Sequence, residues 1–197
     1  MPTKRHFVHS IPINSRNYGL CSDKKTYLFG FSGDLHYLCR QKKVKKMKRI
    51  LFVCHGNICR SPMAEYVMKD MAEKAGRSEE FYIESAATST EEIGNGVYPP
   101  ARRKLAEHGI GCAGHHARQM TRSDYQRFDM LIGMDSWNIR NMERICGGDP
   151  EKKIHKLTEF CNRPQDDVAD PWYTGDFEAT WRDVEEGCKA LLRIKNG

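Results

Sequence analysis

A cysteine and an arginine stand six residues apart in the segment from Cys54 to Pro62, which reads Cys-His-Gly-Asn-Ile-Cys-Arg-Ser-Pro. A short apolar run of the strand type precedes this segment, and a helical pattern follows it. The segment is therefore expected to be a loop that enters a helix N-terminus. Free backbone N–H groups and the positive end of the helix dipole stabilise an anion at such a place, so the loop predicts a phosphate site that needs no metal.

The side chains of this loop predict a nucleophile that faces a bound phosphate group. The field of the helix favours the thiolate form of Cys54, which makes it reactive. Arg60 can come round the loop and offer two parallel N–H bonds to phosphoryl oxygens, a geometry that lysine lacks. Gly56 and Asn57 suit left-handed loop conformations, and Ser61 can donate a hydrogen bond to the thiolate.

A second cluster, Asp170-Pro171-Trp172-Tyr173, lies far along the chain in the polar segment 158–175, which reads as a long functional loop. Attack of a thiolate on a phosphate ester needs a proton donor for the leaving group, and proline stiffens the loop that would hold the carboxyl group of Asp170. The alternative is that Asp170 caps a turn and that the aromatic residues belong to the core.

From Arg49 onward, short apolar runs alternate with longer amphipathic stretches, which is typical of βαβ units. Ser61 is expected to be the N-cap of the helix after the loop, with Pro62 at its first position. The expected strands are Ile50–Val53, Tyr82–Ala86, Met130–Gly133 and Lys153–Leu157, and the expected helices are Ser61–Ala75, Pro99–His108, Asp135–Ile145 and Asp176–Ile194. This order predicts an α/β fold, a single-domain three-layer sandwich with a four-stranded parallel sheet flanked by helices.

Charge divides the 197 residues into two parts. The first 48 residues hold 11 Lys and Arg against 2 Asp, a net charge of +9, and the rest hold 21 basic and 24 acidic residues, a net charge of −3. We expect residues 1–46 to be a basic leader, disordered or a mis-assigned start, and residues 47–197 to be the domain. The alternative is a tail that binds nucleic acid or an anionic surface, but its charge run lacks periodic aromatic residues.

The eight cysteines show no paired spacing and no secretory signal precedes them, which predicts a reducing, cytoplasmic compartment. No stretch approaches the roughly 18 apolar residues that would span a bilayer, so no membrane association is expected. Cys54, His55 and Cys59 lack a second ligand pair at zinc spacing, so neither a metal nor another cofactor is expected.

Val53 to Glu65 resemble the low-molecular-weight protein tyrosine phosphatase family of bacterial type, whose loop reads Val-Cys-x-Gly-Asn-x-Cys-Arg-Ser-Pro-x-Ala-Glu. The resemblance extends over roughly residues 47–194. It implies hydrolysis of phosphotyrosine in a protein substrate through a phosphocysteine intermediate, with inorganic phosphate as product. Asp170 would be the general acid and then the base that activates water. The phosphate-binding residues would be His55, Gly56, Asn57, Ile58, Cys59 and Arg60.

The resemblance also implies supporting residues. Trp172 and Tyr173 would wall the cleft and stack on a substrate ring. Ser85 and His115 align with residues that hydrogen-bond the loop asparagine and hold its shape, although both could be ordinary structural residues. Cys59 is a redox candidate, because a thiol in the same loop can form a disulfide with an oxidised Cys54; the alternative is that it only packs under the loop.

Three other functions are weighed against this one. Phosphoarginine phosphatases resemble this chain but carry a smaller threonine where Ile58 stands, and arsenate reductases need a close cysteine pair late in the chain. The later cysteines, which we expect to be small buried apolar residues, are Cys112, Cys146, Cys161 and Cys188, separated by 34, 15 and 27 positions. An inactive phosphopeptide-binding module is disfavoured because Cys54, Arg60 and Asp170 occur together. Glu91 and Glu92 stand where many relatives carry a large aromatic residue, which predicts an acidic rim.

Overall fold

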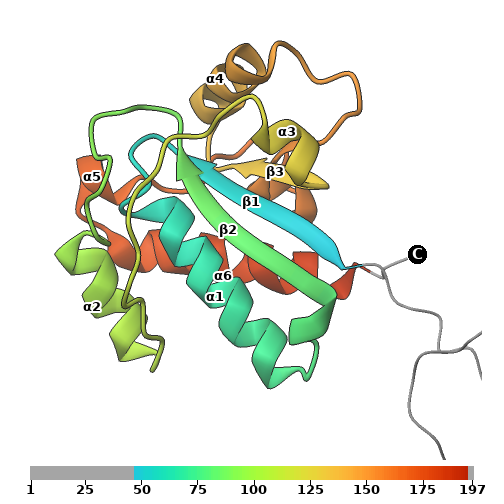
Figure 1. Cartoon of the computed structure of the whole chain (residues 1–197). Coiled ribbons are helices and arrows are strands. Elements are labelled where there is room, and N and C mark those ends of the chain that lie inside the picture. The colour runs from blue at the N-terminus through green and yellow to red at the C-terminus, as the bar shows by residue number, and fades with distance from the viewer. Residues whose placement is uncertain (1–46, 195–197) are drawn as a thin grey trace, which may run out of the picture. The chain divides into compact units, whose positions relative to one another are not determined.

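The computed structural model describes residues 47–194, which belong to one compact unit. The expectations for residues 1–46 lie outside the described residues. The described residues form a four-stranded parallel sheet with helices packed on its two faces (Figure 1). The predicted α/β fold class is confirmed.

The sheet has the strand order β2-β1-β3-β4, and every neighbouring pair is parallel. Its strands are β1 (Lys48–Cys54), β2 (Phe81–Ala87), β3 (Met130–Gly133) and β4 (Ile154–Lys156). All four were predicted. The bounds of β1, β2 and β4 differ from the prediction by one or two residues at an end, because strand ends carry a weak pattern.

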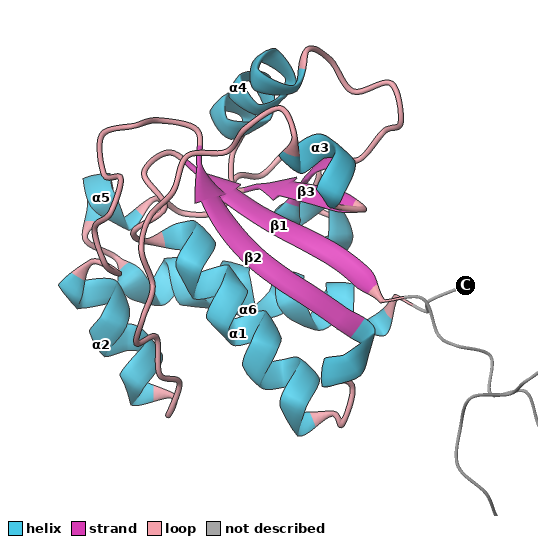
Figure 2. Cartoon of the chain, viewed as in Figure 1, coloured by secondary structure: helices cyan, strands magenta, loops and turns pink. Residues whose placement is uncertain are grey.

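Six α-helices and two short 3-10 helices surround the sheet within residues 47–194 (Figure 2). The α-helices are α1 (Arg60–Lys74), α2 (Pro99–Glu107), α3 (Asp124–Arg127), α4 (Ser136–Cys146), α5 (Pro171–Thr174) and α6 (Phe177–Arg193). The 3-10 helices are η1 (Ser78–Glu80) and η2 (Leu157–Cys161). The four long helices were predicted, whereas the segment 158–175 is not one long loop, because it contains part of η2 and all of α5.

The expectation that Ser61 caps α1 is wrong. The helix begins at Arg60, the residue before it is Cys59, and no side chain caps its first N–H groups. Ser61 lies inside the first turn, fully buried. The uncapped N–H groups of this turn remain available to an anion, which is what a phosphate loop requires.

Strand β1 is buried on both sides because its residues alternate between two cores. Ile50 and Phe52 pack in one core with residues of α1, α2 and α6, and Leu51 and Val53 pack in the other with residues of α3 and α4. All four are fully buried. The strand is therefore fixed in the centre of the sheet, and the loop that leaves its carboxyl end starts from a rigid base.

Candidate active site

The loop between β1 and α1 is held in a strained shape around Asn57. This residue is fully buried and has a φ of 58°, in the left-handed region that residues other than glycine rarely occupy. Its Nδ2 donates to Ser61 Oγ at 2.9 Å and to Ser85 Oγ at 2.8 Å. The Nε2 atom of His115 lies 2.8 Å from its carbonyl oxygen. Ser85 and His115 therefore contact the loop asparagine, as the sequence predicted.

Further residues support this network from behind. The backbone N–H of Arg118 donates to Asn57 Oδ1 at 3.2 Å. Ser85 Oγ donates to Glu65 Oε2 at 2.5 Å, and Glu65 forms an ion pair of 2.5 Å with Lys69. Arg118 and Glu65 were not singled out from the sequence, although Glu65 stands in the motif that carries the family resemblance. Every polar group of the Asn57 side chain is satisfied, which keeps the loop in one conformation.

The thiol of Cys54 lies at the centre of the loop and is 3% exposed. Its Sγ atom accepts the backbone N–H of Asn57 at 3.3 Å and lies 3.0 Å from Ser61 Oγ. Ser61 Oγ accepts a hydrogen bond from Asn57 and has one proton, which it can donate to the sulfur at 3.0 Å or to the carbonyl oxygen of Ala86 at 3.4 Å. The sulfur thus has one backbone donor and one possible hydroxyl donor, an arrangement that suits a thiolate.

Arg60 is clamped by two carboxylates from separate segments. Its Nη1 lies 2.6 Å from Asp135 Oδ2, and its Nη2 lies 2.6 Å from Asp170 Oδ2. Burial disfavours the charged guanidinium, but Cys54, Asp170 and Asp135 raise the Arg60 pKa above its ordinary value. Asp135 was not predicted as a site residue. It also caps α4, where it accepts the N–H of Asn138 at 2.6 Å, and this capping pattern was its only sequence signal.

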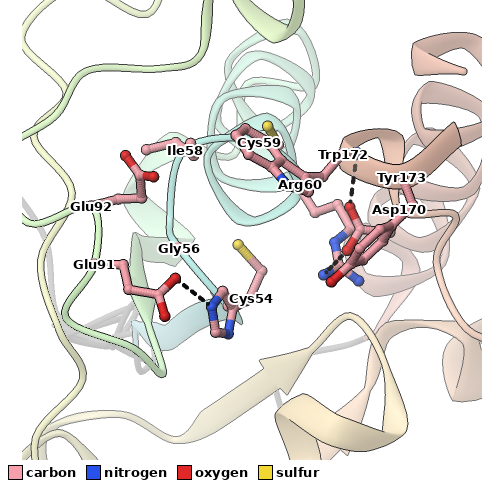
Figure 3. A pocket seen from close by; sticks show the side chains of 11 residues that line it. Cys54, Gly56, Ile58, Cys59, Arg60, Glu91, Glu92, Asp170, Trp172 and Tyr173 are labelled. Atoms are coloured by element: carbon pink, nitrogen blue, oxygen red, sulfur yellow. Dashed lines mark hydrogen bonds and ion pairs between the residues drawn. The ribbon is translucent and has the colours of Figure 1, made fainter. Parts of the chain in front are cut away.

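Cys54, Arg60 and Asp170 lie at one cavity of about 180 Å³ (Figure 3). It is lined by Cys54, His55, Gly56, Ile58, Cys59, Arg60, Glu91, Glu92, Asp170, Trp172 and Tyr173. Asn57, predicted among the phosphate-binding residues, is buried behind the cavity and directs its backbone N–H at the Cys54 sulfur.

The Asp170 segment forms one wall of this cavity. Asp170 accepts the N–H of Trp172 at 3.0 Å and so caps α5, as the alternative interpretation expected. The same carboxylate is paired with Arg60 in the cavity, so capping does not remove it from the site. Trp172 and Tyr173 are 57% and 85% exposed, so they are not core residues.

The opposite rim of the cavity is acidic, as expected. Glu91 Oε2 lies 3.0 Å from His55 Nε2, and both side chains are exposed. Glu92 accepts a hydrogen bond from Asn95 at 2.7 Å. A Cβ atom added at Gly56 would lie 3.1 Å from Glu92 Cγ, so the loop passes close to this rim because it has no side chain there.

The second cysteine of the loop differs from the first in its environment. Cys59 is buried and packs with Ile58 and Ala117. Burial raises the pKa of the Cys59 thiol to about 12, and the charge of Cys54 is the second cause. Cys59 is therefore a protonated thiol at neutral pH. The structure contains no disulfide among the described cysteines, so the redox role stays a prediction.

The later cysteines stand apart from the cavity, since none of them lines it. Cys112, Cys146 and Cys188 are buried, as expected, whereas Cys161 is only half-buried because it ends the 3-10 helix η2. Within residues 47–194, no three His, Cys, Asp or Glu side chains gather as metal ligands. Over the same residues, no helix has the length and apolar character needed to cross a membrane.

Comparison with known proteins agrees with this geometry. The family model described as low molecular weight phosphotyrosine protein phosphatase matches residues 49–196. The low molecular weight protein-tyrosine-phosphatase YfkJ of Bacillus subtilis is 37% identical over 147 residues, which cover 74% of this chain and 94% of the relative. The low molecular weight phosphotyrosine protein phosphatase of Gallus gallus is 40% identical over 154 residues, which cover 75% and 95%. The chain belongs to the low molecular weight phosphotyrosine protein phosphatase family.

Solved structures support the same assignment. The crystal structure of Bacillus subtilis YfkJ superimposes on this phosphatase with a TM-score of 0.72, at 37% identity, over 75% of this chain and 93% of that one. The Drosophila arginine phosphatase has a TM-score of 0.67 at a lower identity of 28%, over 75% and 96% of the two chains. The phosphatase is therefore an enzyme that hydrolyses phosphomonoesters, and it is more similar to YfkJ, at 37% identity, than to this arginine phosphatase, at 28%.

Proposed function

We propose that this phosphatase hydrolyses phosphotyrosine in protein substrates through a phosphocysteine intermediate formed on Cys54. The observation that carries the proposal is the ion pair of 2.6 Å between Arg60 and Asp170, which line one cavity with the Cys54 thiol. A nucleophile, a phosphate-binding cation and a carboxyl group are thus within reach of one phosphate ester. These are the three groups that a cysteine-dependent hydrolysis requires.

In the first step, the phosphate group enters the loop between β1 and α1. The backbone N–H groups of the loop and the Arg60 guanidinium bind its oxygens and stabilise the charge of the transition state. The Cys54 thiolate attacks phosphorus in line with the leaving oxygen, so the S–P bond forms as the P–O bond breaks. Asp170, in its protonated form, donates its proton to the leaving phenolate.

In the second step, a water molecule attacks the phosphorus of phosphocysteine. Asp170, now a carboxylate, accepts a proton from this water. The S–P bond breaks, Cys54 leaves as a thiolate and inorganic phosphate is released. The Ser61 hydroxyl, 3.0 Å from the sulfur, stabilises the departing thiolate.

The walls of the cavity favour an aromatic phosphate ester. Trp172 and Tyr173 can contact the ring of a phosphotyrosine, and Ile58 adds an apolar surface at the loop. No cofactor, nucleic acid or membrane takes part in the proposed reaction. We also propose a cytoplasmic location, because a reducing compartment keeps Cys54 as a thiol.

The proposed intermediate can be trapped directly. p-Nitrophenyl phosphate labelled with ³²P is mixed with the Asp170→Asn variant, which lacks the base of the second step, and the reaction is quenched in denaturant during turnover. This substrate is used because its good leaving group needs little help from the missing acid in the first step. We expect the label on the peptide that contains Cys54. A label on His55 instead, or no label while product still forms, would contradict the mechanism.

Substrate class is tested by turnover of phosphotyrosine, phosphoarginine and arsenate under the same conditions. We expect kcat/KM to be highest for phosphotyrosine, because the apolar side chain of Ile58 and the aromatic wall suit a phenyl ring. A higher value for phosphoarginine would replace the proposed substrate and leave the cysteine chemistry intact.

A further inference from the structure

A second hollow adjoins the active-site cavity, since Trp172 lines both. This aromatic groove is also lined by Tyr98, Pro100, Arg103 and Phe177. Its volume is about 440 Å³, against 180 Å³ for the cavity. Ligand pockets typically measure roughly 300–1,000 Å³, so the groove can hold side chains of a bound polypeptide.

The walls of the aromatic groove are packed rings that come from different elements. Tyr98 stands just before α2, Trp172 belongs to α5 and Phe177 begins α6. The ring centroids of Tyr98 and Trp172 are 5.5 Å apart, and those of Tyr98 and Phe177 are 6.3 Å apart. Helices α2 and α5 accordingly lie next to each other in Figure 1. Because Tyr98 and Phe177 also pack against the core, their positions are fixed before any ligand arrives.

The charge of Arg103 favours an acidic ligand in the aromatic groove. Arg103 is an exposed residue on α2 that lines the groove. The next residue, Lys104, already forms ion pairs with Glu107 at 2.5 Å and with Glu178 at 2.9 Å. Arg103, whose charge also acts on Glu107 of the same helix, provides positive charge at the groove for an acidic ligand group, whereas the other rim of the cavity carries Glu91 and Glu92.

We propose that the aromatic groove binds the stretch of substrate polypeptide that flanks the phosphotyrosine. An apolar side chain of the substrate packs against Tyr98, Trp172 and Phe177, and an acidic side chain pairs with Arg103. The inference rests on the proposed function, since it takes the phosphotyrosine to be held in the adjoining cavity. A chain that leaves the cavity across Trp172 enters the groove directly, because the two hollows share that side chain.

The test compares kcat/KM for two phosphotyrosyl peptides, one with leucine and aspartate on one flank and one with serine at both positions. One such pair of peptides is made for the N-terminal side of the phosphotyrosine and another for its C-terminal side. Each kcat/KM is divided by the kcat/KM of the same enzyme variant for p-nitrophenyl phosphate, so that changes in the chemistry cancel. For the wild type we expect a preference for the leucine and aspartate peptide of about threefold to tenfold on one flank, the range that exposed charge and apolar contacts supply.

Arg103→Glu should reduce or invert the preference for the leucine and aspartate peptide, because the aspartate then faces a carboxylate. Arg102→Glu is the matched control, because it makes the same charge change on the same helix at an exposed residue that lines a different hollow, with Val97 and Ile110. It should keep the wild-type preference. Phe177→Ala should reduce the same preference, because leucine loses the ring against which it packs. If this variant has a lower melting temperature than the wild type, the comparison of Arg103→Glu with Arg102→Glu tests the proposal by itself.

Three results would overturn the proposal: a wild type without preference on either flank, an Arg103→Glu variant with the wild-type preference, or an equal loss in both arginine variants. Turnover of p-nitrophenyl phosphate and its loss in Cys54→Ser report on the proposed function separately. If Cys54→Ser loses turnover of p-nitrophenyl phosphate but the peptides show no preference, the proposed peptide binding in the groove is wrong and the proposed cysteine chemistry stands.

Discussion

The carboxylate of Asp170 and the guanidinium of Arg60 are joined by an ion pair of 2.6 Å, although the two residues come from opposite ends of the domain. The side chain of Asp170 is 26% exposed and that of Arg60 is 5% exposed, so solvent screens the ion pair only in part. We expect a phosphate dianion that binds the Arg60 guanidinium to compete with the Asp170 carboxylate for it. Such competition would weaken the ion pair and free the carboxyl group for proton transfer, which would couple the two proposed roles.

The proton-donor role of Asp170 predicts a dependence on the leaving group. Asp170→Asn should slow aryl phosphates with poor leaving groups by roughly 10²–10⁴-fold, the usual worth of a general acid, and slow good leaving groups far less. The measurement is kcat/KM for a series of aryl phosphates at one pH, because kcat/KM reports the first step, in which the leaving group departs, and not the hydrolysis of phosphocysteine. Asp176→Asn is the matched control, because Asp176 only caps α6 and asparagine caps equally well. An equal loss across the series would remove Asp170 from this role.

Asp135 is expected to position Arg60 without taking part in proton transfer. Asp135→Asn keeps an acceptor for the N–H of Asn138, so α4 stays capped, but it removes the negative charge beside Nη1 of Arg60. A charged hydrogen bond is worth about 1.5–3 kcal/mol, so the Kd for vanadate should rise by roughly tenfold or more. The melting temperature should change little. An unchanged vanadate Kd would show that Asp170 alone fixes the guanidinium.

The sequence predicted the elements with long periodic patterns and singled out the two segments that the structure brings together at one cavity. It did not predict α3 and α5, because each has four residues and a helical period needs more. It also missed that Asp135 contacts Arg60, because this contact depends on β3 lying beside β1 in the sheet. The role of Ser61 was mistaken because a serine hydroxyl can bond either a backbone N–H or a side chain, and residue type does not distinguish the two.

Cys59 gives a redox prediction. Its pKa of about 12 keeps it a thiol below that pH, so peroxide at neutral pH should oxidise Cys54 first. The Cys59 thiol can then attack the sulfenic acid, which forms a disulfide and releases water. Peroxide-treated wild type should regain activity with dithiothreitol, whereas treated Cys59→Ser should not. Equal recovery of both, or of neither, would assign Cys59 a packing role only.

The leader is expected to add nothing to the phosphatase domain. Residues 1–46 carry no periodic apolar pattern that could pack against a core. A chain that begins at Met47 should therefore keep the kcat/KM and the melting temperature of the full chain. A fall of several degrees in melting temperature would mean that the leader packs on the domain.

Cys54 is proposed as the nucleophile of a phosphate loop whose other groups bind the phosphate. Cys54→Ser removes the thiolate but leaves Arg60 and the backbone N–H groups of the loop in place. The most direct measurement is turnover of a phosphotyrosyl peptide by this variant, together with the Kd of vanadate by titration. We expect turnover to fall to the background rate while vanadate still binds. Turnover within tenfold of the wild type would contradict it.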